Sequence, residues 1–199
     1  MLIPWTVVKP VTHQIGLGVF ATRAIPAGTL IWVEDCLDRR IPIEEFRRLR
    51  APLLEHAYTH AYIPCGANYY LLCWDGAKFM NHSCAPNCLS VAAGVEIAAA
   101  DIRAGEQMTC DYSGYGLEEW EKFECRCGAP ACCGVVATQT RPDAKREQAA
   151  LTAQALHRAA WVEQPLAFLL SDEQLPHHRM TPPRQRASQA GTLRFSFGA

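Results

Sequence analysis

The sequence has no apolar run that could cross a membrane, because no stretch approaches the roughly 18 uninterrupted apolar residues that a spanning helix needs. Its start, Met1-Leu2-Ile3-Pro4-Trp5, also lacks the basic segment and apolar core of an export signal. We therefore expect no membrane partner. We expect a location inside the cell, in the cytoplasm, with nuclear or chromatin association left open.

An excess of one charge is also missing: 19 Lys and Arg against 20 Asp and Glu give a formal net charge of -1. The sequence therefore has no broad basic field of the kind that attracts nucleic acid or anionic membranes. From Pro176 onward the chain does carry arginines without any acidic residue. This segment is expected to be a mobile basic tail, limited to weak, salt-sensitive contacts with nucleic acid.

Three other absences remove further classes of protein. There is no internal repeat with a period of about 20 to 50 residues, which excludes solenoids and propellers. There is also no Cys-x-x-Cys pair, which argues against a redox protein of the thioredoxin type. The Gly16-Leu17-Gly18 turn lacks the third spaced glycine and the following helix of a dinucleotide site.

What the sequence does have is ten cysteines and 49% apolar residues. The apolar fraction suffices for one sizeable core, or for one core with a small appended module. Without an export signal, the cysteines are interpreted as thiols and metal ligands, with a disulfide in an oxidising compartment as the alternative. Cys36, Cys65 and Cys73 are expected to be small buried residues.

Hydrophobic periodicity predicts a mainly β protein with few helices. Residues 6–33 form short β-branched and aromatic runs broken by glycine and proline, as in hairpins. In residues 41–62 apolar residues recur at helical spacing, which predicts one or two helices inserted between strands. Strands are expected again at 69–74 and 94–99. The alanine-rich stretch 143–162 predicts a surface helix packed by one apolar edge, Trp161 included.

The middle of the chain carries polar motifs in a particular order. Residues 79–88 read Phe-Met-Asn-His-Ser-Cys-Ala-Pro-Asn-Cys, Thr109-Cys110-Asp111-Tyr112 follows, and Cys125-Arg126-Cys127 and Cys132 come last. With Gly16-Leu17-Gly18-Val19-Phe20-Ala21 before them, this order resembles the SET domain family. Members of that family transfer a methyl group from S-adenosylmethionine to a lysine side chain of a protein. The resemblance spans roughly residues 4 to 136.

The resemblance implies a SET-domain β-fold of several small sheets, with a helical insert, a zinc-binding post-SET segment and a C-terminal helix. It implies an S-adenosyl-L-methionine-dependent protein-lysine N-methyltransferase with Tyr112 as the catalytic residue. The implied cofactor-binding residues are Gly16, Leu17, Gly18, Asn81 and His82. The implied ligands of a structural Zn²⁺ are Cys84, Cys125, Cys127 and Cys132. Spacing favours Cys132 over its neighbour Cys133, but the sequence leaves that choice open.

The implied boundaries are 4–114 for the SET domain, with a helical insert at about 36–68, and 115–137 for the post-SET zinc-binding segment. Residues 138–199 would hold the C-terminal helix and the basic tail. Trp120 or Phe123 in the post-SET segment could fold over the bound cofactor. A lysine-containing protein is the implied substrate, and nothing in the sequence selects among histones, ribosomal proteins and others.

Cys110 departs from the family pattern, which usually has Tyr or Phe two residues before the catalytic tyrosine. A thiol is smaller than a phenol and a weaker hydrogen-bond partner, so more room around the target amine is expected. The site would then tolerate di- or trimethylation. The same departure supports the alternative function, a catalytically inactive SET-like module that binds a protein or peptide and keeps zinc for structure.

Overall fold

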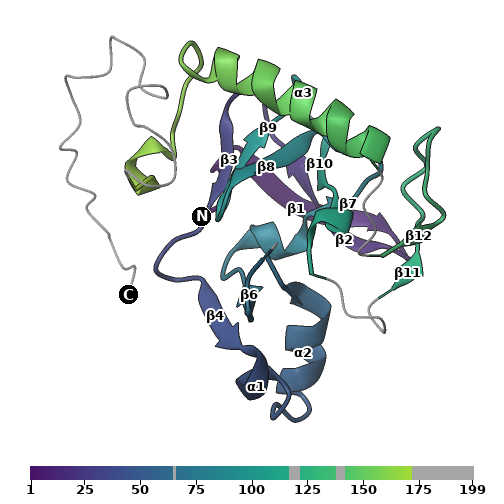
Figure 1. Cartoon of the computed structure of the whole chain (residues 1–199). Coiled ribbons are helices and arrows are strands. Elements are labelled where there is room, and N and C mark those ends of the chain that lie inside the picture. The colour runs from purple at the N-terminus through teal and green to yellow at the C-terminus, as the bar shows by residue number, and fades with distance from the viewer. Residues whose placement is uncertain (65, 117–121, 138–141, 172–199) are drawn as a thin grey trace, which may run out of the picture.

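The computed structural model describes residues 1–64, 66–116, 122–137 and 142–171. Within these residues the chain forms four small sheets and few helices, so the predicted fold class is confirmed (Figure 1). The predicted basic tail lies outside the described residues. The strands are β1 (Thr6–Thr12), β2 (Gly16–Ala21), β3 (Leu30–Val33), β4 (Arg39–Pro42), β5 (Ala61–Tyr62), β6 (Tyr69–Leu72), β7 (Asn81–His82), β8 (Cys88–Ala92), β9 (Val95–Ala98), β10 (Gln107–Cys110), β11 (Phe123–Glu124) and β12 (Val135–Val136). The α-helices are α1 (Ile43–Phe46), α2 (Leu53–His60) and α3 (Pro142–Ala159).

The four-stranded sheet has the order β1-β2-β10-β7 and joins motifs that are far apart in the sequence. β1 and β10 pair antiparallel with β2, whereas β7 pairs parallel with β10. In that parallel pair Asn81 lies opposite Thr109, and His82 lies opposite Cys110. The Asn-His motif therefore lies beside the strand that leads into Tyr112.

A three-stranded sheet, β3-β9-β8, lies at the centre of the main core. All four residues of β3 and all four of β9 are buried, including Glu96, whose neighbours in β9 are apolar. Glu96 pairs across the sheet with Trp32 of β3. Side chains at paired positions lie on the same face of a sheet, so Trp32 and Glu96 point in the same direction.

The predicted helical insert is confirmed and carries a small core of its own. α1 and α2 lie with the sheet β4-β6-β5, in the lower part of Figure 1. Phe46 stacks on Tyr70 with ring centroids 3.7 Å apart, and Ile41, Ala57 and Ile63 complete this core. Tyr70 is thus part of the core of the insert.

Helix α3 runs across β8 and the neighbouring strands, as the top of Figure 1 shows. It packs closely over Gly28, where an added Cβ would lie 2.6 Å from the carbonyl oxygen of Ala155 and 2.8 Å from the amide of Ala159. The expected apolar edge is present, but Trp161 does not belong to it. The helix ends at Ala159, and Trp161 is 77% exposed. In the part of the chain described here, no helix is both long and apolar enough to cross a membrane.

The segment after α3 is anchored by the buried side chain of Gln164. Its Oε1 accepts a hydrogen bond from the Leu30 amide at 2.8 Å. Its Nε2 donates to the carbonyl oxygens of Gly28 and Ala159, at 2.8 and 2.9 Å. One side chain thereby satisfies three backbone groups and joins the C-terminal segment to β3.

Replacing Gln164 by alanine should lower the free energy of unfolding by about 3 kcal/mol, because buried backbone groups lose their partners. Urea denaturation followed by circular dichroism measures this change. Gln14→Ala, at an exposed position, is the matched control and should change stability by less than about 0.5 kcal/mol. Equal stability of the two variants would contradict the anchoring role.

Candidate functional site

The Gly-x-Gly motif at the start of β2 and the Asn-His motif of β7 meet in the four-stranded sheet. Asn81 donates a hydrogen bond from Nδ2 to the carbonyl oxygen of Leu17, at 2.8 Å. Gly16 has φ +82°, a conformation that side chains disfavour. At Gly18 an added Cβ would lie 3.0 Å from Asn81 Nδ2 and 2.6 Å from Gln107 Nε2. The glycines thus permit a turn and a close approach, and four of the five predicted cofactor residues lie together.

The loop after the Asn-His motif is held in place by Asn87. The Thr109 amide donates to Asn87 Oδ1 at 2.9 Å, and Asn87 Nδ2 donates to the carbonyl of Gln107, also at 2.9 Å. The Ser83 amide donates to the carbonyl of Cys110 at 2.9 Å. These bonds tie the Asn-His-Ser-Cys-x-Pro-Asn run to β10, and they place Cys84 at a defined position beside the sheet.

His82 joins the cofactor motif to the tyrosine motif and to the cysteines. The Tyr112 amide donates to His82 Nδ1 at 3.1 Å, and His82 Nε2 lies 3.3 Å from Cys84 Sγ. Asp111 Oδ1 lies 3.6 Å from Nδ1. Because Nδ1 accepts a hydrogen bond, Nε2 carries the proton of the neutral ring. The fifth predicted cofactor residue therefore supports the backbone of Tyr112 from one side and faces the cysteine cluster from the other.

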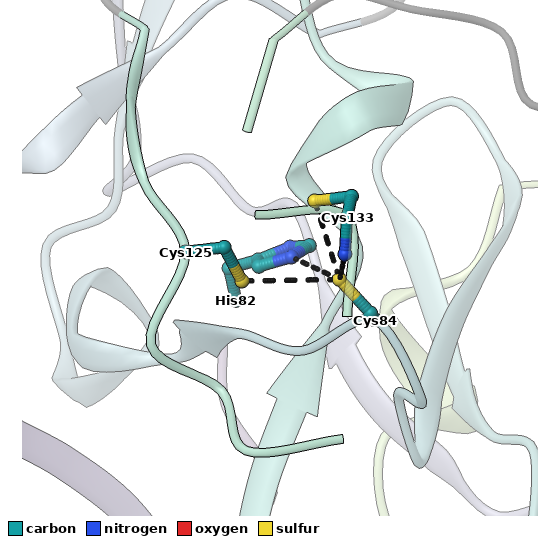
Figure 2. Close-up of side chains that lie close together, drawn as sticks. All are labelled: His82, Cys84, Cys125 and Cys133. Carbon is teal, nitrogen blue, oxygen red and sulfur yellow. Dashed lines mark hydrogen bonds between the residues drawn. The ribbon is translucent and has the colours of Figure 1, made fainter. Parts of the chain in front are cut away.

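The four cysteines predicted from the sequence as zinc ligands lie close together. Cys84, Cys125, Cys127 and Cys132 bring their sulfur atoms within 4.8 Å of one another. In a second set the possible ligand atoms also lie within 4.8 Å of one another; this set consists of His82, Cys84, Cys125 and Cys133. Figure 2 shows these four side chains pointing toward one another. Cys84 Sγ lies 3.8 Å from Cys125 Sγ and 3.4 Å from Cys133 Sγ. Four thiol sulfurs at this spacing suit a tetrahedral structural zinc.

The late cysteines of the cluster, Cys125 to Cys133, lie in the connection between β11 and β12, whose strands pair antiparallel, whereas Cys84 follows β7. Within this connection, the amide of Cys125 donates to the carbonyl of Gly134 at 2.8 Å. Burial disfavours the Cys127 thiolate, but the amides of Cys84 and Ala129 donate to its sulfur, and its pKa falls to about 7. Burial raises the pKa of the Cys84 thiol to about 12. Among the other cysteines, Cys73 is buried as expected, Cys65 lies outside the described residues, and the expectation that Cys36 is buried is wrong because it is exposed.

Tyr112 lies on a cavity of about 400 Å³ whose lining includes several aromatic residues and also two lysines, Lys78 and Lys122. Its hydroxyl donates to the carbonyl of Met80 at 2.5 Å, and burial raises its pKa above the ordinary value. The ring of Tyr115 lies 5.6 Å from that of Tyr112 and 4.5 Å from that of Tyr62. The ring of Phe123 lies 6.2 Å from that of Tyr112, whereas Trp120, the other predicted cover, lies outside the described residues.

The cavity residues that sequence reasoning missed include Tyr62, Tyr115 and Glu96. The hydroxyl of Tyr115 donates to Glu96 Oε1 at 3.0 Å, and it lies 3.5 Å from Cys110 Sγ. The tyrosine hydroxyl therefore occupies part of the space next to the small residue at position 110. A lone charge in the apolar run Val-Glu-Ile-Ala-Ala-Ala was the one sequence signal that marked Glu96.

The comparisons with known proteins agree with this geometry. The family model described as SET domain matches residues 16–113. A histone-lysine N-methyltransferase specific for H3 lysine 4 from Schizosaccharomyces pombe is 46% identical over 65 residues, which cover 29% of this chain and 7% of that protein. A histone-lysine N-methyltransferase specific for H3 lysine 36 from Mycosarcoma maydis is 30% identical over 150 residues, covering 66% of this chain and 14% of that protein. The chain therefore spans only a small part of the relatives it matches.

Among solved structures, the crystal structure of the methyltransferase domain of human histone-lysine N-methyltransferase SETMAR matches with a TM-score of 0.45 and 20% sequence identity. This match covers 63% of the present chain and 55% of the other.

Proposed function

Since this chain belongs to the SET domain family, we propose that it is an S-adenosylmethionine-dependent protein-lysine N-methyltransferase. The observation that carries the proposal is the convergence of two motifs: Asn81 binds the Gly-x-Gly turn, while the adjacent strand delivers Tyr112 to an aromatic cavity. The boundaries proposed from the sequence, 4–114 for the SET domain and 115–137 for the post-SET segment, belong to the same proposal.

The proposed roles follow from the contacts. Gly16, Leu17 and Gly18 offer backbone groups to the cofactor, and Asn81 and His82 border the same region. S-adenosylmethionine, when bound, supplies the methyl group. Zn²⁺, held by Cys84, Cys125, Cys127 and Cys132, would fix the β11–β12 hairpin and with it Phe123 at the cavity.

Tyr112 and the aromatic wall prepare the amine for transfer. Direct displacement requires the nitrogen lone pair to point along the carbon–sulfur bond, at about 3 Å from the methyl carbon. The Tyr112 hydroxyl is fixed by its bond to Met80, so its oxygen can accept an N–H of the amine at a constant position. The aromatic side chains keep water away, which disfavours the charged form of the lysine and favours the nucleophilic neutral amine.

The substrate side of the proposal is a lysine-bearing protein. The relatives are named as histone methyltransferases, so histones are one class to test, with chromatin included in the proposed intracellular location. The small side chain of Cys110 leaves di- or trimethylation as the predicted product range. Mass spectrometry of the modified lysine checks this, and monomethyl product alone after long incubation would contradict it.

Gly18→Ala tests the cofactor site. The added methyl group forces Asn81 Nδ2 and Gln107 Nε2 to move, which disturbs the bond to Leu17. We expect affinity for S-adenosylhomocysteine, measured by calorimetry, to fall about tenfold or more, which corresponds to at least ~1.4 kcal/mol. Gly114→Ala, where nothing lies within 4 Å of the added Cβ, is the matched control and should bind normally. Full affinity in Gly18→Ala would place the cofactor elsewhere.

A further inference from the structure

Glu96 is the most unusual buried group in the structure. It is 7% exposed and lies between apolar residues in the central strand β9. Within the described part of the chain, its carboxylate accepts one hydrogen bond, from the Tyr115 hydroxyl, and forms no ion pair with a Lys, Arg or His. A buried carboxylate without a cation is costly, and such groups are normally paired.

The position of Glu96 indicates a function for this buried, unpaired carboxylate. Its side chain borders the same cavity as Tyr112, together with Cys110, Tyr115 and Tyr62. Glu96 Oε1 is taken by Tyr115, which leaves Oε2 with no hydrogen-bond partner in the described residues. Because Oε2 is not among the fully enclosed atoms that lack a partner, it retains some accessible surface. Glu96 Oε2 can therefore accept a hydrogen bond from a molecule bound in the cavity.

A second, independent observation comes from Trp32, the cross-strand partner of Glu96. Trp32 also lines the cavity and is 3% exposed, yet its Nε1–H is a buried donor without an acceptor in the described part of the chain. Buried donors in folded proteins are nearly always satisfied. An unsatisfied donor and an available carboxylate oxygen on the lining of one cavity indicate that the cavity can hold a polar molecule.

Aromatic rings and a carboxylate together suit a cation. Tyr62, Tyr115 and Tyr112 line the cavity that Glu96 also borders, with their rings close to one another, and ring faces attract ammonium groups. Burial raises the pKa of Glu96, although the bond from Tyr115 opposes this, and a cation nearby would lower the pKa again. Unmethylated and monomethylated lysine keep an N–H to donate to the carboxylate both as the ammonium and as the neutral amine.

From these contacts we infer that Glu96 is the specificity-determining residue that receives the target lysine amine, accepting an N–H of the amine at the end of the aromatic cavity. The inference rests on the proposed function, in which this cavity receives the lysine side chain of the substrate. Glu96 is a recognition residue in this scheme. Tyr112 keeps its proposed role of accepting another N–H of the amine at the transfer position, and the Trp32 indole N–H signal reports on binding in the cavity.

The test uses n-butylammonium, which reproduces the lysine side chain, so it needs no known protein substrate. The full chain, uniformly labelled with ¹⁵N and loaded with zinc, is titrated while the indole N–H signal of Trp32 is followed, its assignment made with Trp32→Phe. We expect a saturable shift with n-butylammonium and none with the neutral probe n-butanol. Absence of a saturable shift with n-butylammonium would overturn the inference, whether or not the protein methylates lysine.

Two variants distinguish recognition from a structural role. Glu96→Gln removes the charge and can still accept from Tyr115, so the fold and affinity for S-adenosylhomocysteine should be retained while n-butylammonium binds about tenfold more weakly. Glu55→Gln on α2, exposed and outside the cavity lining, makes the same change of charge and should bind as the wild type does. With any protein substrate, KM should rise in Glu96→Gln and cofactor affinity should not. Unchanged n-butylammonium binding in Glu96→Gln would overturn the inference.

Discussion

Replacing Tyr112 by phenylalanine is expected to lower kcat for lysine methylation about 100-fold while leaving affinity for S-adenosylhomocysteine nearly unchanged. The hydroxyl bound to Met80 is the only atom removed, and without it the amine loses a fixed acceptor in line with the methyl group. Misplacement of reacting groups by about 1 Å typically costs a factor of this size. Single-turnover kinetics and calorimetry separate the two quantities.

The control for this prediction is Tyr70→Phe, which removes the same atom from a buried tyrosine in the core of the insert. It should retain wild-type kcat. If Tyr112→Phe kept more than about a third of the wild-type kcat, the catalytic role would be wrong. If cofactor affinity fell in parallel with kcat, Tyr112 would be a structural residue of the cofactor site.

Replacing Cys84 by serine is expected to remove the bound zinc and, with it, most of the activity. Cys84 and Cys125 occur in both possible ligand sets, whereas Cys132 and Cys133 each occur in one. Losing a shared ligand leaves three donors where a tetrahedral site needs four. Zinc content measured by mass spectrometry should fall from about one ion per chain to well below half. Thermal unfolding should also shift downward, because metal binding contributes directly to folding.

Single variants in the same region decide which thiol completes the site. Cys132→Ser should lose zinc if the set predicted from the sequence is correct, and Cys133→Ser should then retain it. Cys36→Ser, exposed and outside both sets, is the control. Full zinc content in Cys84→Ser would contradict the assignment of this cluster as a metal centre.

The sequence predicted the parts of the site that depend on local order. The Gly-x-Gly turn, the Asn-His-Ser-Cys run and Tyr112 are short motifs whose spacing along the chain is informative by itself. These motifs meet because β7 pairs parallel with β10. The order of the motifs predicted this pairing only through the family resemblance.

The lining of the cavity could not be predicted, because it is made by residues that approach only in the folded chain. Tyr62 comes from the insert and Tyr115 from the turn after Tyr112, while Glu96 comes from a central strand. Local pattern also failed at Trp161, where an alanine-rich helical period continues beyond the residue at which α3 ends. Spacing favoured Cys132 over Cys133 without deciding between these adjacent thiols, and both reach the cluster.

The central claim is tested most directly by incubating the zinc-loaded full chain with methyl-labelled S-adenosylmethionine and a panel of basic proteins that includes core histones and ribosomal proteins. Tyr112→Phe and a zinc-chelated sample run beside it. The account predicts label on a lysine of at least one protein, with the label strongly reduced in both parallel samples. Absence of label on every protein, together with absence of S-adenosylmethionine binding in calorimetry, would contradict it and favour a non-catalytic module that binds a protein or peptide.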